Sequence, residues 1–300
     1  MKYFLRLSRE NLILAREEVI SLMKTKKFKL VDNFLIIDEK INFDLLAYTF
    51  EVYKFVFYSD KLNIDWNEII KGSYKVEGEN AIKYADIIWN KLKKPKVNMK
   101  KPKNQIQFFK IGGKILCGIL LKEIKNNFEE RKAHRKPGYY PMSLNPKLAR
   151  AMINLSRGNI ILDPFCGAGT ILVEAGLMNK KIIGNDVSEK MIKLSKINLK
   201  YYKIKDYNLH NYDALKLKLK VDAIVTDPPY GKGSYATINA EELLGRFLKI
   251  AGKMLIEKGR IVFTFNKPVK IPKEFKLVRK FKIYIHKSMN KYIYTLEKWK

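Results

Sequence analysis

Apolar and polar positions follow a regular pattern along the second half of the chain. Short β-branched runs alternate there with longer segments whose apolar residues recur at helical spacing. This alternation is typical of a parallel sheet with right-handed helical crossovers. The expected strands are residues 159–162, 181–186, 207–214, 221–225 and 261–265, and the expected helices are residues 171–175, 187–202 and 241–256. Two final strands, 275–285 and 292–297, have no helix between them, which predicts an antiparallel hairpin closing the sheet.

The first 140 residues have a different pattern, that of an α+β domain. The expected strands are residues 2–7, 28–37 as a hairpin-like pair, 45–58, 73–76, 105–109 and 115–120, and the expected helices are residues 11–23, 66–70 and 80–92. A chain of this length allows about two domains. We therefore predict one domain at residues 1–140 and a second at residues 141–300.

The strand expected at 221–225 stops abruptly at Asp227-Pro228-Pro229-Tyr230. In open α/β sheets, ligands bind at the carboxyl ends of strands. The tetrapeptide would place a carboxylate, a rigid carbonyl and an aromatic ring at one strand end. Asp227 and the Pro228 carbonyl could accept the two N–H groups of an exocyclic amine, on a ring stacked against Tyr230. An Asp-Pro-Pro sequence is also an ordinary strand-ending turn, so this motif alone leaves both interpretations open.

A glycine-containing loop follows the strand expected at 159–162. Its sequence is Asp163-Pro164-Phe165-Cys166-Gly167-Ala168-Gly169-Thr170. Glycines allow the backbone to approach a ligand closely. The loop is neither a phosphate-binding P-loop, since no Gly-Lys-Ser/Thr follows, nor a complete dinucleotide fingerprint, since the sixth position is Leu172. Asp163 would repel a pyrophosphate and instead suits a cationic ligand such as a sulfonium amino acid.

Two more acids follow at the ends of the next expected strands. Asp186 at the end of 181–186 suits a pair of ribose hydroxyls, and Asp213, next to Ala214, could accept from an adenine amino group. Each acid taken singly is explained as a helix cap or a solvated loop residue. Four acids at four successive strand ends are harder to explain by capping.

These motifs, in this order, resemble those of S-adenosylmethionine-dependent amino-methyltransferases, over about half of the chain from Ser143 onward. The segment 136–150, which includes Pro146-Lys147-Leu148-Ala149-Arg150, resembles the linker and first helix of archaeal tRNA guanosine-10 N2-methyltransferases, which carry an N-terminal THUMP domain. Family members usually have Gly-Ser-Met-Ser before this helix, whereas this chain has Met142-Ser143-Leu144-Asn145. Asn145 is also a suitable N-cap and Pro146 a suitable first helical residue.

The resemblance implies a Rossmann-like methyltransferase domain preceded by an α+β region of ferredoxin-like and THUMP type. It implies tRNA as the partner, S-adenosylmethionine as the cofactor, and N2-methyl- and N2,N2-dimethylguanosine as products. No metal is expected, and no protein partner is required, while an activator subunit is neither indicated nor excluded. The implied catalytic residues are Asp227, Pro228 and Tyr230. The implied cofactor-binding residues are Asp163, Phe165, Gly167, Gly169, Thr170, Asp186, Asp213 and Ala214.

The net charge is the strongest compositional signal. There are 60 Lys and Arg residues against 30 Asp and Glu, a formal net charge of +30. Such an excess attracts polyanions and favours a nucleic-acid partner, although a lysine-rich proteome would produce part of it. Residues 91–110 contain eight lysines and no acid. This tract is either a solvated loop or a surface for backbone phosphates, and residues 128–136 form a second basic cluster near the expected domain junction.

The remaining features concern the cellular compartment. Two distant cysteines, Cys117 and Cys166, form no disulfide framework or metal-ligand spacing, and the chain has no apolar run of membrane-spanning length. These features predict a cytoplasmic protein without a membrane anchor.

Three rival functions remain open at this point. A DNA adenine or cytosine amino-methyltransferase would use the same Asp-Pro-Pro-Tyr set, and a related enzyme would methylate guanosine-6 of tRNA. An RNA-binding protein with a vestigial catalytic half is the third.

Overall fold

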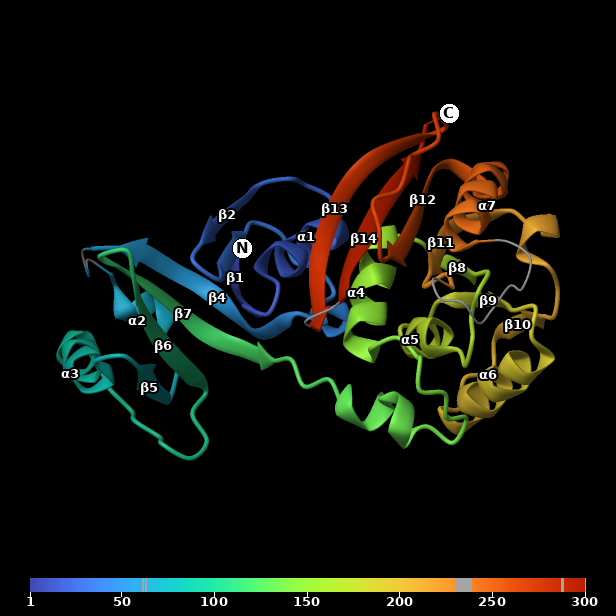
Figure 1. Ribbon diagram of the computed structural model, residues 1–300. Helices are drawn as coiled ribbons and strands as arrows, with labels where there is room; N and C mark the ends of the chain where they lie inside the picture. The colour runs from blue at the N-terminus through green and yellow to red at the C-terminus, as the bar shows by residue number, and fades with distance from the viewer. Residues whose placement is uncertain (61, 63, 230–238, 287–288, 300) are drawn as a thin grey trace. The chain divides into compact units, whose positions relative to one another are not determined.

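The computed structural model describes residues 1–60, 62, 64–229, 239–286 and 289–299 (Figure 1). Contacts divide the chain into two compact units that interleave in sequence. The first unit comprises residues 1–12, 23–44 and 49–125, and the second comprises residues 13–22, 45–48 and 126–300. The division into an RNA-binding region up to residue 140 and a catalytic domain from 141 stays a prediction. The unit with the C-terminal sheet also includes residues 126–140 and two short N-terminal pieces.

The first unit is built on a seven-stranded sheet with the strand order β2-β3-β1-β4-β7-β6-β5. Neighbouring strands are antiparallel, except that β5 and β6 are parallel. The strands are β1 (Tyr3–Leu7), β2 (Phe28–Val31), β3 (Phe34–Ile37), β4 (Thr49–Ser59), β5 (Tyr74–Gly78), β6 (Asn104–Ile111) and β7 (Lys114–Glu123). The helical segments of the N-terminal region are α1 (Leu12–Leu22), η1 (Phe43–Leu45), α2 (Trp66–Ile69) and α3 (Ala81–Lys91).

Two hairpins of this sheet follow from their turn residues. Asp32, between β2 and β3, has φ 52°, and Gly112 and Gly113, between β6 and β7, have φ 55° and 76°. Two-residue turns with positive φ match the twist of antiparallel strands, and Gly and Asp tolerate that region of φ. Both hairpins therefore appear where the sequence predicts them.

The second unit contains a second seven-stranded sheet, with the order β10-β9-β8-β11-β12-β14-β13. The first five strands in this order are parallel, and the last two are antiparallel. This arrangement confirms the expected fold class, including the final hairpin. The strands are β8 (Ile160–Asp163), β9 (Lys181–Asn185), β10 (Tyr207–His210), β11 (Val221–Thr226), β12 (Leu255–Phe265), β13 (Phe275–His286) and β14 (Met289–Lys298). The helical segments are η2 (Glu129–Arg131), η3 (Ala133–Arg135), α4 (Pro146–Ser156), α5 (Thr170–Leu177), α6 (Glu189–Tyr201), η4 (Ala214–Lys216) and α7 (Ala240–Met254).

Helices cover both faces of this sheet, and its central strands β8 and β11 are accordingly buried on both faces. Helix α5 contacts both α4 and α6, so these three form one layer, whereas α7 packs against β12 and η4 (Figure 1). Side chains of a strand alternate between its two faces. On β12, Ile261, Phe263 and Phe265 belong to the core cluster that contains the apolar side of α7. Val262 and Thr264 are also fully buried and face the other way.

Local capping explains where α4 begins. Asn145 accepts a hydrogen bond from the Lys147 amide at 2.9 Å, and Pro146 is the first helical residue. Several expected boundaries differ from the structure; for example, the strand expected from residue 45 begins at Thr49. Strand β10 ends at His210 instead of continuing toward residue 214, and α7 ends at Met254, with β12 beginning at once because Leu255 pairs with Val221. No helix among the described residues is long and apolar enough to cross a membrane.

Candidate active site at the carboxyl ends of the parallel strands

A cavity of about 460 Å³ lies at the carboxyl ends of β8, β9 and β11. In the sheet, β8 lies between β9, which follows it in sequence, and β11, so the strand order reverses at β8. Ligands of doubly wound sheets bind at such a topological switch point. The volume suits a small-molecule ligand. The lining residues are Tyr140, Met142, Ser143, Leu144, Asp163, Phe165, Cys166, Gly167, Ala168, Thr170, Ile171, Asp186, Val187, Ser188, Met191, Asp227, Pro228 and Pro229.

The two glycines of the loop after β8 serve different purposes. Gly167 has φ 52°, and a Cβ added to it would meet nothing within 4 Å, so its bare backbone faces open space. Gly169 has φ 80°, and a Cβ there would lie 2.7 Å from the Ser195 hydroxyl of α6. That hydroxyl donates to the Gly167 carbonyl at 2.8 Å. The absence of a side chain at Gly169 therefore lets Ser195 of α6 pack against the loop and hydrogen-bond to it.

Asp186 lies beside this loop, directly after β9. One carboxylate oxygen accepts the Gly167 amide and the other accepts the Ser188 amide, both at 2.9 Å. Burial raises the pKa of Asp186, and these two hydrogen bonds oppose the rise. Because each carboxylate oxygen can accept about two hydrogen bonds, both oxygens can still accept from two neighbouring hydroxyls.

Asp163, at the end of β8, is fully buried at the cavity wall. Its Oδ1 accepts the Thr226 hydroxyl at 2.7 Å and the Phe165 amide at 3.2 Å. Burial nevertheless raises the pKa of Asp163 to about 8, and the neighbouring charges of Asp186 and Asp227 add to the rise. A cation entering the cavity would stabilise the ionised form and lower this pKa.

Asp227, after β11, has a quite different environment. Lys291 of β14 places its Nζ atom 2.7 Å from Oδ1 and 2.8 Å from Oδ2, and the Thr264 hydroxyl of β12 also donates to Oδ1. Lys291 is only 5% exposed. Sequence reasoning missed both partners. The available signal was the alternation of β14, which puts Lys291 on the same buried face as Ile293.

Several other predicted site residues also line the cavity, while some lie elsewhere. Asp213 accepts from the Leu215 amide at 2.9 Å as the cap of η4, and Ala214 is buried in the core beside α7. Neither of these, nor Gly169, lines the cavity. Tyr230 lies outside the described residues. The predicted residues that the cavity brings together are Asp163, Phe165, Gly167, Thr170, Asp186, Asp227 and Pro228.

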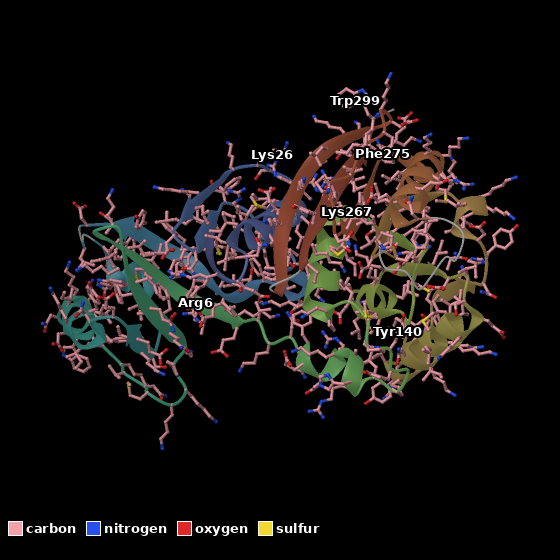
Figure 2. All side chains as sticks on the ribbon, in the orientation of Figure 1. Arg6, Lys26, Tyr140, Lys267, Phe275 and Trp299 are labelled. Carbon is pink, nitrogen blue, oxygen red and sulfur yellow. The ribbon has the colours of Figure 1, made fainter. Side chains whose placement is uncertain are left out.

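The segment that precedes α4 forms part of the cavity wall. Tyr140, labelled in Figure 2, lines the cavity with Met142, Ser143 and Leu144, so the departure from Gly-Ser-Met-Ser lies at the cavity itself. The Ser143 hydroxyl donates to the Tyr140 carbonyl at 2.7 Å, which fixes this turn. Among the described residues, no group of three or more His, Cys, Asp or Glu side chains could hold a metal ion.

Residues upstream of Tyr140 hold the glycine loop, residues 163–170, through hydrogen bonds to Thr170 and Ala168. The buried Lys136 donates to the Thr170 hydroxyl at 2.6 Å, and burial lowers the pKa of Lys136 to about 8. The Asn198 side chain of α6 joins Gly138 to Ala168, accepting from the Gly138 amide at 2.9 Å and donating to the Ala168 carbonyl at 2.8 Å. The basic cluster expected at 128–136 is thus partly internal.

Comparisons with known proteins decide the family. A model described as RMKL-like, methyltransferase domain matches residues 133–293, and one described as DNA methylase matches residues 3–197, which end before Asp227. A tRNA (guanine(10)-N2)-dimethyltransferase from Pyrococcus abyssi is 37% identical over 256 residues, which cover 78% of this chain and 77% of the relative. The chain belongs to this methyltransferase family.

Two further comparisons bear on the rivals and on the fold. A tRNA (guanine(6)-N2)-methyltransferase from Methanocaldococcus jannaschii is 24% identical over 71% of this chain and 70% of the relative, so the dimethyltransferase family is favoured. The crystal structure of TrmN from Thermus thermophilus covers 100% of both chains with a TM-score of 0.54 at 21% identity, which supports the fold.

Proposed function

We propose that this protein transfers methyl groups from S-adenosylmethionine to the exocyclic N2 amine of guanosine-10 in tRNA, first to N2-methylguanosine and then to N2,N2-dimethylguanosine. The observation that carries the proposal is the position of Asp227. This carboxylate, paired with Lys291, lines the cavity beside Pro228, at the switch point that also contains Asp186 and Gly167. Family membership supplies tRNA and the N2 amine as the substrate.

The residues at the cavity fit the cofactor. Asp186 has acceptor sites left for the two ribose hydroxyls, and the bare backbone at Gly167 permits close approach. Asp163 supplies a carboxyl group that a positive ligand would ionise. S-adenosylmethionine, when bound, supplies a methyl group activated by a sulfonium. Phe165 and Thr170 would complete the cofactor side of the cavity.

The residues after β11 would orient the base. An exocyclic amine is a poor nucleophile, because its lone pair is delocalised into the ring. Asp227 and the Pro228 carbonyl would each accept one N2 hydrogen, which favours a pyramidal nitrogen with its lone pair aimed at the methyl group. Tyr230 is proposed to stack on the base. Positioning and electrostatics then provide most of the catalysis, and a helical base must first leave its stack.

The charge of the first unit supports tRNA as the partner. All eight lysines of the tract 91–110 are exposed, and no acid lies within the tract. Exposed lysines neutralise phosphates without reading sequence. We also propose that this unit binds tRNA in the manner of a THUMP domain and that the enzyme acts as a single chain. The proposed compartment is the cytoplasm, where the free, buried Cys117 and Cys166 would stay reduced.

Nucleoside mass spectrometry tests the function. Unmodified transcribed tRNA is incubated with the full-length protein and S-adenosylmethionine, and the modified position is then mapped. We expect N2,N2-dimethylguanosine at position 10, formed through the monomethyl nucleoside. Modification at guanosine-6, or of an adenine or cytosine amine, would establish one of the rivals instead. A full chain that bound both substrates but transferred no methyl group would support the vestigial alternative.

A further inference from the structure

Asp227 is held by a rigid clamp that two neighbouring strands of the sheet provide. Thr264 comes from β12 and Lys291 from β14, and these strands are paired antiparallel in continuous register from Arg260↔Glu297 to Phe265↔Tyr292. The Lys291 side chain is 6% exposed and that of Asp227 is 14% exposed. Both clamping side chains extend from the face of the sheet opposite α7, because they alternate with the residues that pack against that helix.

The clamp uses the two carboxylate oxygens unequally. Oδ1 accepts from both Thr264 and Lys291, whereas the described residues place only Lys291 on Oδ2. Each oxygen offers about two acceptor positions. The remaining position on Oδ2 is thus the one available to the amine of a base. A carboxylate fixed in this way presents one acceptor in one direction.

We propose that Lys291 is a positioning residue, and that with Thr264 it makes the second methyl transfer possible. This inference rests on the function proposed above and assigns a role in it to two residues outside the Asp-Pro-Pro-Tyr motif. Lys291 acts through Asp227, by holding its carboxylate in place so that Oδ2 is directed at N2.

Both transfers have the same chemical balance. The N2 lone pair forms the new N–C bond, and the S–C bond breaks with its electron pair remaining on sulfur, which leaves S-adenosylhomocysteine. The methylated nitrogen then loses one proton, and Asp227 Oδ2 is the acceptor already in contact with it. Guanosine has two N2 hydrogens in the first round and only one in the second.

This difference makes the second transfer depend more strongly on the clamp. In the first round, the Pro228 carbonyl can hold the amine through one N–H even if Asp227 is badly oriented. In the second round, one N–H remains, and a hydrogen bond to a charged acceptor is about twice as strong as one to a neutral carbonyl. The monomethylated amine is therefore held by Asp227, with its methyl group on the Pro228 side. Loosening Asp227 then removes the only hydrogen bond that aims the lone pair.

Single-turnover time courses of both transfers test the inference, with the full-length protein and tRNA. Lys291→Met keeps an unbranched side chain that is one atom shorter, and it removes the charge. We expect the second transfer to slow roughly 10- to 100-fold more than the first, the size expected from one charge-assisted hydrogen bond, so that N2-methylguanosine accumulates.

The controls separate positioning from folding. Lys282→Met makes the same change at an exposed position on the neighbouring strand β13 and should leave the ratio of the two rates unchanged. Thr264→Val removes only the hydroxyl and should shift the products in the same direction as Lys291→Met, which decides the question if the lysine variant does not fold. Variants that fold and slow both transfers equally, or that form the dimethyl product at the wild-type ratio, would overturn the inference. If the wild-type protein forms no dimethylguanosine, the proposed function itself fails.

Discussion

Two carboxyl groups at the ends of adjacent strands have opposite surroundings. Asp163 is enclosed without a counter-ion at hydrogen-bond distance among the described residues, and burial raises its pKa to about 8. Asp227 is paired with Lys291. Different environments can give two neighbouring acids different roles. We propose that Asp227 addresses the base and that Asp163 responds to the charge of the ligand.

The first prediction concerns pH and cofactor affinity. Below about pH 8 the ligand-free protein holds a proton on Asp163. Because a sulfonium lowers this pKa, binding at pH 7 should release a proton, and affinity should rise with pH and level off above about 8. Calorimetry in buffers of different ionisation enthalpy measures the released proton. The Asp163→Asn variant corrects for titration of the ligand itself, and proton release as large in this variant as in the wild type would refute the role of Asp163.

The same pKa affects the stability of the ligand-free protein. The folded pKa of Asp163 is raised from 3.8 to about 8, so the folded state binds this proton more tightly than the unfolded state. The contribution is present in full below the unfolded pKa and is lost as pH rises toward 8. We expect the free energy of unfolding, measured with denaturant, to fall over this interval less steeply for Asp163→Asn than for the wild type. Parallel curves would contradict the raised pKa.

A third prediction separates the two halves of the cavity. Asp227→Ala should abolish methyl transfer while changing cofactor affinity only a few-fold, because the role proposed for Asp227 is to address the base. Asp186→Ala should weaken cofactor binding first, since each hydrogen bond to a charged group contributes roughly 1.5–3 kcal/mol. Calorimetric titration and single-turnover assays of both variants distinguish the outcomes. Appreciable turnover by Asp227→Ala, or unchanged affinity in Asp186→Ala, would reject the respective role.

At the scale of elements, the spacing of apolar residues predicted most strands and helices, because burial of one or both faces produces a local pattern of apolar positions. The exceptions have physical causes. The strand expected at 207–214 ends at His210, since Asp213 caps η4 and leaves the ladder. Lys291 was not singled out among 60 basic residues, because the final strand was expected only from residue 292 and the burial of Lys291 depends on pairing between β12 and β14. The inward position of Arg131 and Lys136 likewise results from tertiary packing that a charge pattern does not show.

Helix α5, which follows the glycine loop, is attached by a buried ionic cluster. The Glu174 carboxylate is fully buried and lies 2.6 Å from Arg131 Nε and 2.9 Å from Arg150 Nε. Arg131 belongs to the segment before α4, and Arg150 belongs to α4 itself. The cluster therefore joins η2 and α4 to α5, the helix that follows the glycine loop.

The fourth prediction follows from this cluster. Glu174→Ala leaves two buried guanidinium groups without their carboxylate and should lower the free energy of unfolding by about 3–5 kcal/mol. Glu189→Ala, which breaks an exposed pair with Lys193 on α6, is the matched control and should cost less than about 1 kcal/mol. Denaturant titration compares the two. A loss in Glu174→Ala no larger than in the control would show that the cluster contributes little.

At the scale of the whole molecule, the charge excess should make tRNA binding strongly dependent on salt. Lysine–phosphate contacts release condensed counterions, so affinity falls steeply as salt rises. The eight exposed lysines at 91–110 are the densest such tract. Composition predicted a polyanionic partner, but it could not select which lysines contact it, because exposed lysines occur throughout both units.

A fifth prediction makes that selection. Replacing Lys94, Lys96, Lys100 and Lys101 together with alanine should lower tRNA affinity and flatten its salt dependence, without affecting cofactor binding. The comparison variant replaces the four exposed lysines of α6, which are Lys190, Lys193, Lys196 and Lys200. Equal losses in both variants, measured by titration at several salt concentrations, would indicate a general charge effect instead of a binding surface at 91–110.

The central claim is that the cavity directs methyl groups to the N2 amine of guanosine-10. It is tested most directly with two tRNAs that differ only at position 10, one with guanosine and one with inosine, which lacks the N2 amine. With methyl-labelled cofactor and the full-length protein, we predict two methyl groups per guanosine-10 tRNA and none on the inosine-10 tRNA. Equal labelling of both tRNAs would contradict the account.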